Sequence, residues 1–139
     1  MSNTANLGHV SASGKHANAV NPLRILGLTA AAVGLNLVAL WIGAAAGASL
    51  QVAAPEPINA MTVVIMTAAP LLLAGAVVWL LARRFPVRRL AGWVGLIFAL
   101  VTSAGSFLAS ADVATALTLM SMHVVAGLAW FIALRPWAR

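Results

Sequence analysis

The chain has 139 residues, of which 63% are hydrophobic and only 7% charged. A soluble domain carries roughly a quarter charged residues, so this composition excludes an ordinary soluble fold, a disordered chain and a nucleic-acid-binding protein. The formal net charge of +6 comes from eight Lys and Arg against two Asp and Glu. The sequence contains no cysteine, which excludes disulfides and cysteine-ligated metals.

Four long stretches contain no charged residue, at 25–54, 57–82, 90–111 and 113–134. A helix needs about 20 apolar residues to cross the hydrocarbon core of a bilayer. The strands of a membrane barrel would instead alternate apolar with polar residues, and these stretches do not alternate. The sequence therefore predicts an all-α, up-down bundle with transmembrane helices at about 24–49, 58–82, 90–109 and 113–134. Asp112 alone separates the last two, which predicts a tight hairpin.

The regions around the predicted domain at 23–135 are short. Residues 1–22 are small and polar, so we expect a flexible tail, and residues 136–139 form a brief end. The small residues at 44–48 raise the alternative of a cleaved signal peptide. The apolar run before them is about 20 residues, longer than a typical 7–15-residue signal core, which favours an uncleaved first helix.

The positive charges all fall on one side of a four-helix threading, and the other side holds only Glu56 and Asp112. Lys and Arg in short loops favour the cytoplasmic side, so we expect both termini in the cytoplasm and the protein in the inner membrane of a bacterium.

Four tryptophans, but not Trp41, lie toward the basic side, as an aromatic belt would: Trp79, Trp93, Trp130 and Trp137. The basic loop either binds acidic lipid headgroups or only sets the topology, and we favour the second interpretation; its arginines are Arg83, Arg84, Arg88 and Arg89.

Polar residues near the middle of the predicted spans are candidate site residues: Asn36, Pro70, Ser103 and His123. His123 is the only ionisable one, and such a residue suggests function by default. It could relay protons or ligate a metal or haem. A zinc site needs three or four ligands and a bis-histidine haem needs a second histidine, so we predict no metal and keep haem through His123 as a lesser possibility. We favour a structural neutral imidazole bonded to Asn36.

Small residues recur along two of the predicted helices. Gly43 and Gly47 form a G-x-x-x-G pattern in the first, and Gly95 and Ala99 share a face of the third. Small residues let membrane helices approach closely. The pattern predicts helix packing at these positions, either within one chain or between chains.

Three short motifs carry a family resemblance, and they lie in the outer turn, at the end of the second helix and in the fourth helix: Ala54-Pro55-Glu56-Pro57, Trp79-Leu80-Leu81-Ala82-Arg83-Arg84 and Met122-His123-Val124-Val125-Ala126-Gly127. Together with the four-helix layout, they resemble a family of small four-helix bacterial membrane proteins catalogued as a domain of unknown function. The resemblance covers about residues 23–135. It implies the four-helix fold and makes Met122, His123 and Gly127 a family feature, but it implies no activity.

The sequence contains no catalytic dyad, phosphate-binding loop or extramembrane domain. We therefore expect a non-catalytic membrane protein, an accessory or packing subunit of a larger complex. Its expected partners are the bilayer and other membrane subunits or further copies of itself. One alternative is a small oligomeric transporter or channel using the midplane polar residues. A second is a redox subunit that binds haem or quinone through His123.

Overall fold

The structure is a computed structural model that describes residues 20–53 and 58–135. Within these ranges the chain forms four helices: α2 (Pro22–Ala45), α3 (Ala60–Leu81), α4 (Arg88–Ala109) and α5 (Val113–Leu134). Each is long and apolar enough to cross a membrane. The prediction of an all-helical, four-helix architecture is confirmed.

Several predicted features fall outside these ranges. They are the polar tail before residue 20, the outer turn at 54–57 with Glu56, and the end at 136–139 with Trp137.

The two ends of α2 differ from the expected range of 24–49. The helix begins earlier, at Pro22, because the Asn21 side chain accepts a hydrogen bond from the Leu23 N–H at 3.0 Å and proline suits the first turn. It ends at Ala45 because Gly47 has a φ of +86°. The Ala48 N–H then donates to the Gly43 carbonyl, which closes the helix in a Schellman motif.

The other helix starts are also explained by their residues. Asn59 and Asp112 cap α3 and α5 by accepting hydrogen bonds from the N–H groups of Thr62 and Thr115, at 3.0 and 2.7 Å. The fourth helix, α4, begins at Arg88 rather than at the expected residue 90. The expected boundary was the first residue of the charge-free stretch, but arginine is itself a good helix former, so the helix begins before that stretch.

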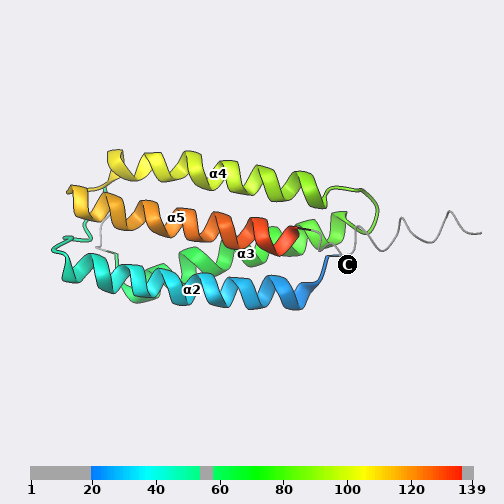
Figure 1. The fold of residues 1–139 in the computed structure, drawn as a ribbon, viewed down its shortest axis with the longest axis horizontal. Coiled ribbons are helices and arrows are strands. Elements are labelled where there is room, and N and C mark those ends of the chain that lie inside the picture. The colour runs from blue at the N-terminus through cyan, green and yellow to red at the C-terminus, as the bar shows by residue number, and fades with distance from the viewer. Residues whose placement is uncertain (1–19, 54–57, 136–139) are drawn as a thin grey trace, which may run out of the picture.

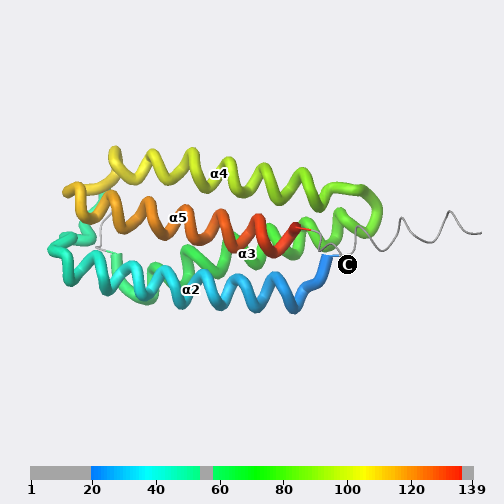
Figure 2. The backbone as a smooth tube through the Cα atoms, viewed as in Figure 1, coloured from blue at the N-terminus to red at the C-terminus, as the bar shows by residue number. Residues whose placement is uncertain are grey.

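The helices are not arranged as a closed bundle (Figure 1). α5 packs along both α4 and α2, and α2 packs in turn on α3. By contrast α3 hardly touches α5, and the consecutive helices α3 and α4 do not pack along each other. The tube in Figure 2 shows α4, α5 and α2 side by side with α3 behind them. The last helix of the chain is therefore the centre of the fold.

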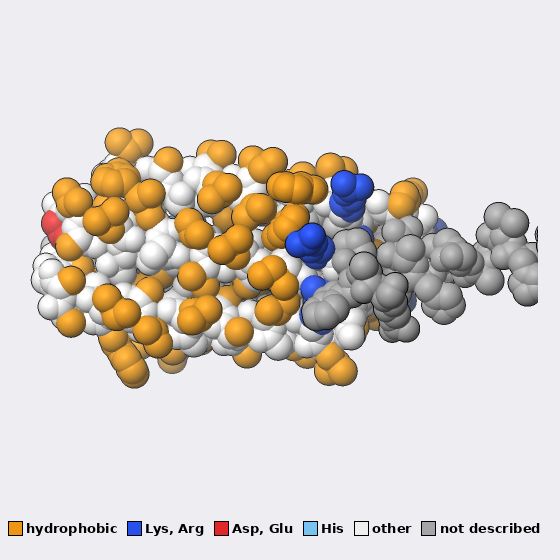
Figure 3. Space-filling model, in the orientation of Figure 1, with side chains coloured by type: hydrophobic (Ala, Val, Ile, Leu, Met, Phe, Trp, Pro, Cys, Tyr) orange, Lys and Arg blue, Asp and Glu red, His pale blue; other side chains and the backbone are white. Residues whose placement is uncertain are grey.

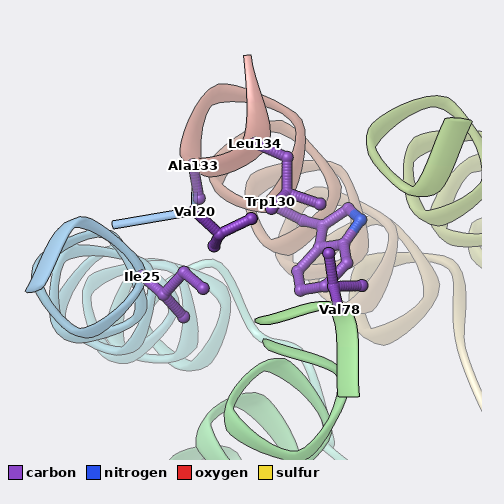
Figure 4. Packing of buried hydrophobic residues seen from close by; sticks show 6 residues of the cluster. All are labelled: Val20, Ile25, Val78, Trp130, Ala133 and Leu134. Atoms are coloured by element: carbon purple, nitrogen blue, oxygen red, sulfur yellow. The ribbon is translucent and has the colours of Figure 1, made fainter. Parts of the chain in front are cut away.

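One hydrophobic cluster lies at the end of the bundle where the α5 helix finishes (Figure 4). It is formed by Val20, Ile25, Val78, Trp130, Ala133 and Leu134. Trp130 is only 7% exposed, and its indole Nε1 donates to the Ala91 carbonyl at 2.8 Å. The sequence interpretation placed Trp130 in a belt at the membrane surface. The absence of a side chain at Gly95 explains the difference, because a Cβ there would lie 2.1 Å from Trp130 Nε1.

Asp112 ties the two loops together at the opposite end. Its carboxylate accepts from the N–H and Oγ of Ser49 and from the N–H and Oγ1 of Thr115. The Thr115 hydroxyl oxygen also accepts from the Leu50 N–H at 2.9 Å. These hydrogen bonds, with that from Ser49 Oγ foremost, hold the pKa of the Asp112 carboxyl far below its ordinary value.

Candidate functional site

The space between α3 and α4 is a groove of about 790 Å³, with part of its floor formed by α5. Along α3 its lining extends from Thr62 to Val78, a distance of about 24 Å at the rise of an α-helix. Most of the lining side chains are apolar. The groove therefore follows much of the hydrocarbon thickness of a bilayer rather than forming a closed central pocket.

Asn36 is the most buried polar residue of the groove, with 2% exposure. Its Nδ2 donates to Thr67 Oγ1 at 3.0 Å, which links α2 to α3. Its Oδ1 is buried and has no hydrogen-bond partner within the part of the chain that the structure describes. A buried acceptor without a donor is costly, so this oxygen favours an added donor.

His123 lines the same groove from α5 and is half-buried. Its Nδ1 lies 2.9 Å from the Leu119 carbonyl oxygen. Because a carbonyl only accepts, Nδ1 carries the hydrogen, which leaves Nε2 as the acceptor in the tautomer with one ring hydrogen. The expected bond between His123 and Asn36 is replaced by these two separate interactions.

Pro70 also lines the groove, and α3 continues through it. Proline has no N–H, so the carbonyl of Met66 loses its usual donor one turn later. Thr67, which follows Met66, accepts a hydrogen bond from Asn36 through its hydroxyl oxygen. The groove thus contains three residues that offer acceptors: Asn36, Met66 and His123.

Ser103 is not part of this group. It is 5% exposed and donates to the Leu100 carbonyl of its own helix at 2.7 Å. Its neighbour Thr102 lines the groove instead. Successive residues of a helix point about 100° apart, so only one of the two can face a given side. The sequence indicated Ser103 from its depth in the helix, but depth alone does not tell which face of the helix lines the groove.

The predicted small-residue positions differ in their roles. A Cβ at Gly43 would lie 2.2 Å from Thr118 Oγ1, so this glycine permits the contact between α2 and α5. Ala99 faces Gly127 across α4 and α5, where an added Cβ would lie 2.6 Å from that of Ala99. Gly47 has open space around it and serves to end α2.

The described arginines gather at the end of the bundle opposite Asp112 (Figure 3). Arg24 donates to the carbonyls of Ile132 and Arg135, and Arg88 donates to those of Leu134 and Arg135. Both therefore cap the C-terminus of α5, where carbonyls lack partners and the helix dipole favours positive charge. The sequence did not indicate this role, because the arginines and the carbonyls are far apart in the chain.

The other arginines of the predicted basic surface have different surroundings. The Arg83 guanidinium stacks over the Trp79 ring, with 3.7 Å from its carbon to the ring centroid. Arg84 and Arg89 are exposed. Among the described residues, no group of three or more His, Asp or Glu side chains could hold a metal ion.

Four apolar helices with charges confined to the two ends define a multi-pass membrane protein. The chain belongs to the family of unknown function DUF6069, whose model matches residues 17–139. This confirms the resemblance drawn from the sequence motifs. No curated protein and no solved structure matches the chain.

Proposed function

We propose that this protein is a non-catalytic accessory subunit of a membrane complex and that its groove holds a transmembrane helix of a partner subunit. The observation that carries the proposal is the open side between α3 and α4. Two consecutive helices joined by a short loop would ordinarily pack on each other. Here they stand apart along about 24 Å of α3.

The lining supports a helix as the occupant. Ala74, Ala91, Ala99 and Ala126 are among the lining residues, and small side chains let membrane helices approach closely. The acceptors at Asn36 and His123 would pair with a donor on the incoming helix, such as a serine, threonine or asparagine. Such bonds contribute about 1 kcal/mol in membranes, so they would select the register of the partner rather than dominate affinity.

The proposed location is the inner membrane of a bacterium, with both termini in the cytoplasm. The support is the charge pattern, because the described positive charges lie at one end and Asp112 at the other. Positive residues in short loops remain on the cytoplasmic side.

Photo-crosslinking in native membranes tests the accessory role. A photoreactive amino acid would replace Phe98, which lines the groove from α4 and is 68% exposed. The matched control is Leu100, two residues away on α4, 47% exposed and outside the groove lining. We expect Phe98 to crosslink to one defined polypeptide, which is also present in the particle purified in mild detergent, and Leu100 to crosslink to lipid.

The result that would contradict this proposal is a particle that contains only this chain, with equal crosslinking from both positions. A bulky Ala126→Phe substitution provides a second test, because it fills the groove from α5. It should release the partner from the purified particle while the four helices remain folded.

A small transporter is the second candidate, and the shared groove of Asn36, Pro70 and His123 favours it. Polar groups and interrupted helices near the middle of the bilayer often mark transport sites. In proteoliposomes, a flux of a small solute that the Asn36→Ala and His123→Ala variants abolish would support this function. Flux that neither variant changes would eliminate it.

A further inference from the structure

A second pocket lies at the basic end of the bundle, between α4 and α5, and is separate from the groove. Its volume is about 440 Å³. Its walls combine arginines with aromatic and aliphatic side chains: Arg88, Arg89, Trp93, Phe131, Leu134 and Arg135. Positive charge and apolar surface therefore meet in one depression at the edge of the predicted membrane.

The arginines of this pocket are not equivalent. Arg88 donates to the carbonyls of Leu134 and Arg135 and so is held in place. The Arg89 and Arg135 side chains are exposed and make no hydrogen bond to any residue in the described ranges. Asp112, the one acidic residue in the described ranges, lies at the other end of the bundle. Within the described ranges, the pocket thus combines positive charge with two exposed guanidinium groups, those of Arg89 and Arg135, that can bind an anion.

The apolar part of the pocket suits a lipid rather than a soluble anion. The Trp93 ring of α4 and the Phe131 ring of α5 are in contact, with centroids 4.8 Å apart. Trp93 remains 47% exposed. Tryptophan is typical of the headgroup level of a bilayer, where a phosphate and the first carbons of acyl chains would both lie within reach.

The start of α4 adds to this complementarity. Its N-cap residue, Val87, offers no side-chain acceptor, and its first turn contains no acidic residue. Arg88 and Arg89 occupy that turn, where the helix dipole already favours negative charge. A phosphate in the neighbouring pocket would relieve this accumulation of positive charge.

We infer that the pocket between α4 and α5 binds the phosphate headgroup of an anionic phospholipid. Arg89 and Arg135 would bind the phosphate, Arg88 would contribute fixed charge, and the acyl chains would continue over Trp93 and Phe131. Basic pockets between transmembrane helices are suited to such headgroups.

The test uses the full chain reconstituted in phosphatidylcholine vesicles with acyl-chain spin-labelled phosphatidylglycerol or phosphatidylcholine. The fraction of immobilised label gives the selectivity for the anionic lipid. We expect about tenfold selectivity in the wild type, because each arginine near the surface adds roughly fivefold before screening. The Arg89→Gln, Arg135→Gln variant should approach equal binding of the two lipids.

The matched control is Arg83→Gln, Arg84→Gln, which removes the same charge from the adjacent loop outside the pocket. It should retain most of the selectivity, as should Arg89→Lys, Arg135→Lys, which keeps the charge. Circular dichroism of each variant verifies the helices. If the Arg83→Gln, Arg84→Gln variant lost as much selectivity for phosphatidylglycerol as the Arg89→Gln, Arg135→Gln variant, the inference would be overturned. Such a result would show that the arginines attract anionic lipids only diffusely, without a binding site.

Inorganic phosphate tests whether the pocket binds the phosphate of a lipid headgroup or a free phosphate ion. Added at constant ionic strength, it should leave the immobilised phosphatidylglycerol in place, because it lacks the acyl chains that contact the aromatic side chains. Displacement by free phosphate would overturn the assignment to a lipid. Neither result depends on the partner helix in the groove.

Discussion

Asp112 illustrates how one residue can organise an end of a membrane bundle. It caps α5 and at the same time holds Ser49, which follows α2, through two hydrogen bonds. A carboxylate that accepts several hydrogen bonds is stabilised in its charged form. The loops at this end are therefore connected by a carboxylate that the fold keeps ionised.

The pH dependence of stability should report this carboxylate. Because the pKa of Asp112 is lowered in the folded state, the unfolded chain takes up a proton first as the pH falls. Its stabilising effect is complete above the ordinary Asp pKa of about 3.9 and is lost below it. We expect the wild type to be more stable than Asp112→Asn at neutral pH, and the difference to shrink only below about pH 4.

Unfolding by sodium dodecyl sulfate in mixed micelles, followed by circular dichroism over a series of pH values, provides the measurement. If the difference in the free energy of unfolding between the wild type and Asp112→Asn were constant down to pH 3, or disappeared near pH 6, it would be inconsistent with this role of Asp112.

At the level of the helices, the contact between α2 and α5 depends on the glycine at position 43. The Thr118 side chain fills the space where a Cβ at position 43 would lie, so a side chain of α5 packs directly on the backbone of α2 at this point. Overfilling a packed contact usually costs about 1–3 kcal/mol.

Gly43→Ala should lower the free energy of unfolding by that amount, measured in the same mixed micelles. Gly34→Ala is the matched control, because it makes the same change in the same helix where no atom lies within 4 Å of the added Cβ. It should be neutral or raise stability by up to about 1 kcal/mol, since alanine restricts the unfolded chain more than glycine. Equal effects of both substitutions would contradict the close contact.

The sequence predicted the helices well because bilayer thickness and charge avoidance constrain them strongly. The hairpin of α4 and α5 followed from the single residue between them. The end of α2 was placed too late because residues 46–49 are small and uncharged, whereas the helix ends where Gly47 adopts a positive φ. Local composition does not encode that backbone conformation.

At the scale of the whole molecule, the separation of charge gives the protein two chemically different ends. The structure describes six arginines at one end and Asp112 at the other. This arrangement underlies the proposed orientation, and single cysteines can test it because the chain contains none of its own.

Gln51→Cys and Arg84→Cys would place one exposed thiol at each end. With a membrane-impermeant maleimide on intact cells, we expect labelling of Gln51→Cys alone, and labelling of Arg84→Cys only after the cells are permeabilised. The reverse pattern would reject cytoplasmic termini, and labelling of both positions on intact cells would reject a single orientation.

The groove was less predictable than the helices. The sequence indicated Asn36, Pro70 and His123 from their depth, and the structure brings all three to one groove. Which helices stay apart depends on pairwise packing, and alanine and glycine occur on too many faces to specify it. The pairing of Asn36 with Thr67 instead of His123 has the same origin, because it requires the order of helices around the bundle.

The central position of α5 has a consequence for biosynthesis. The ribosome releases α2, α3 and α4 before the helix that joins α2 to α4 exists. Until then α4 lacks its main packing surface, and Arg24 and Arg88 lack the carbonyls that they cap. Assembly of α4 must therefore wait for the 22-residue helix α5, and a chain truncated before Val113 would retain the packed pair of α2 and α3 but leave α4 without its partner.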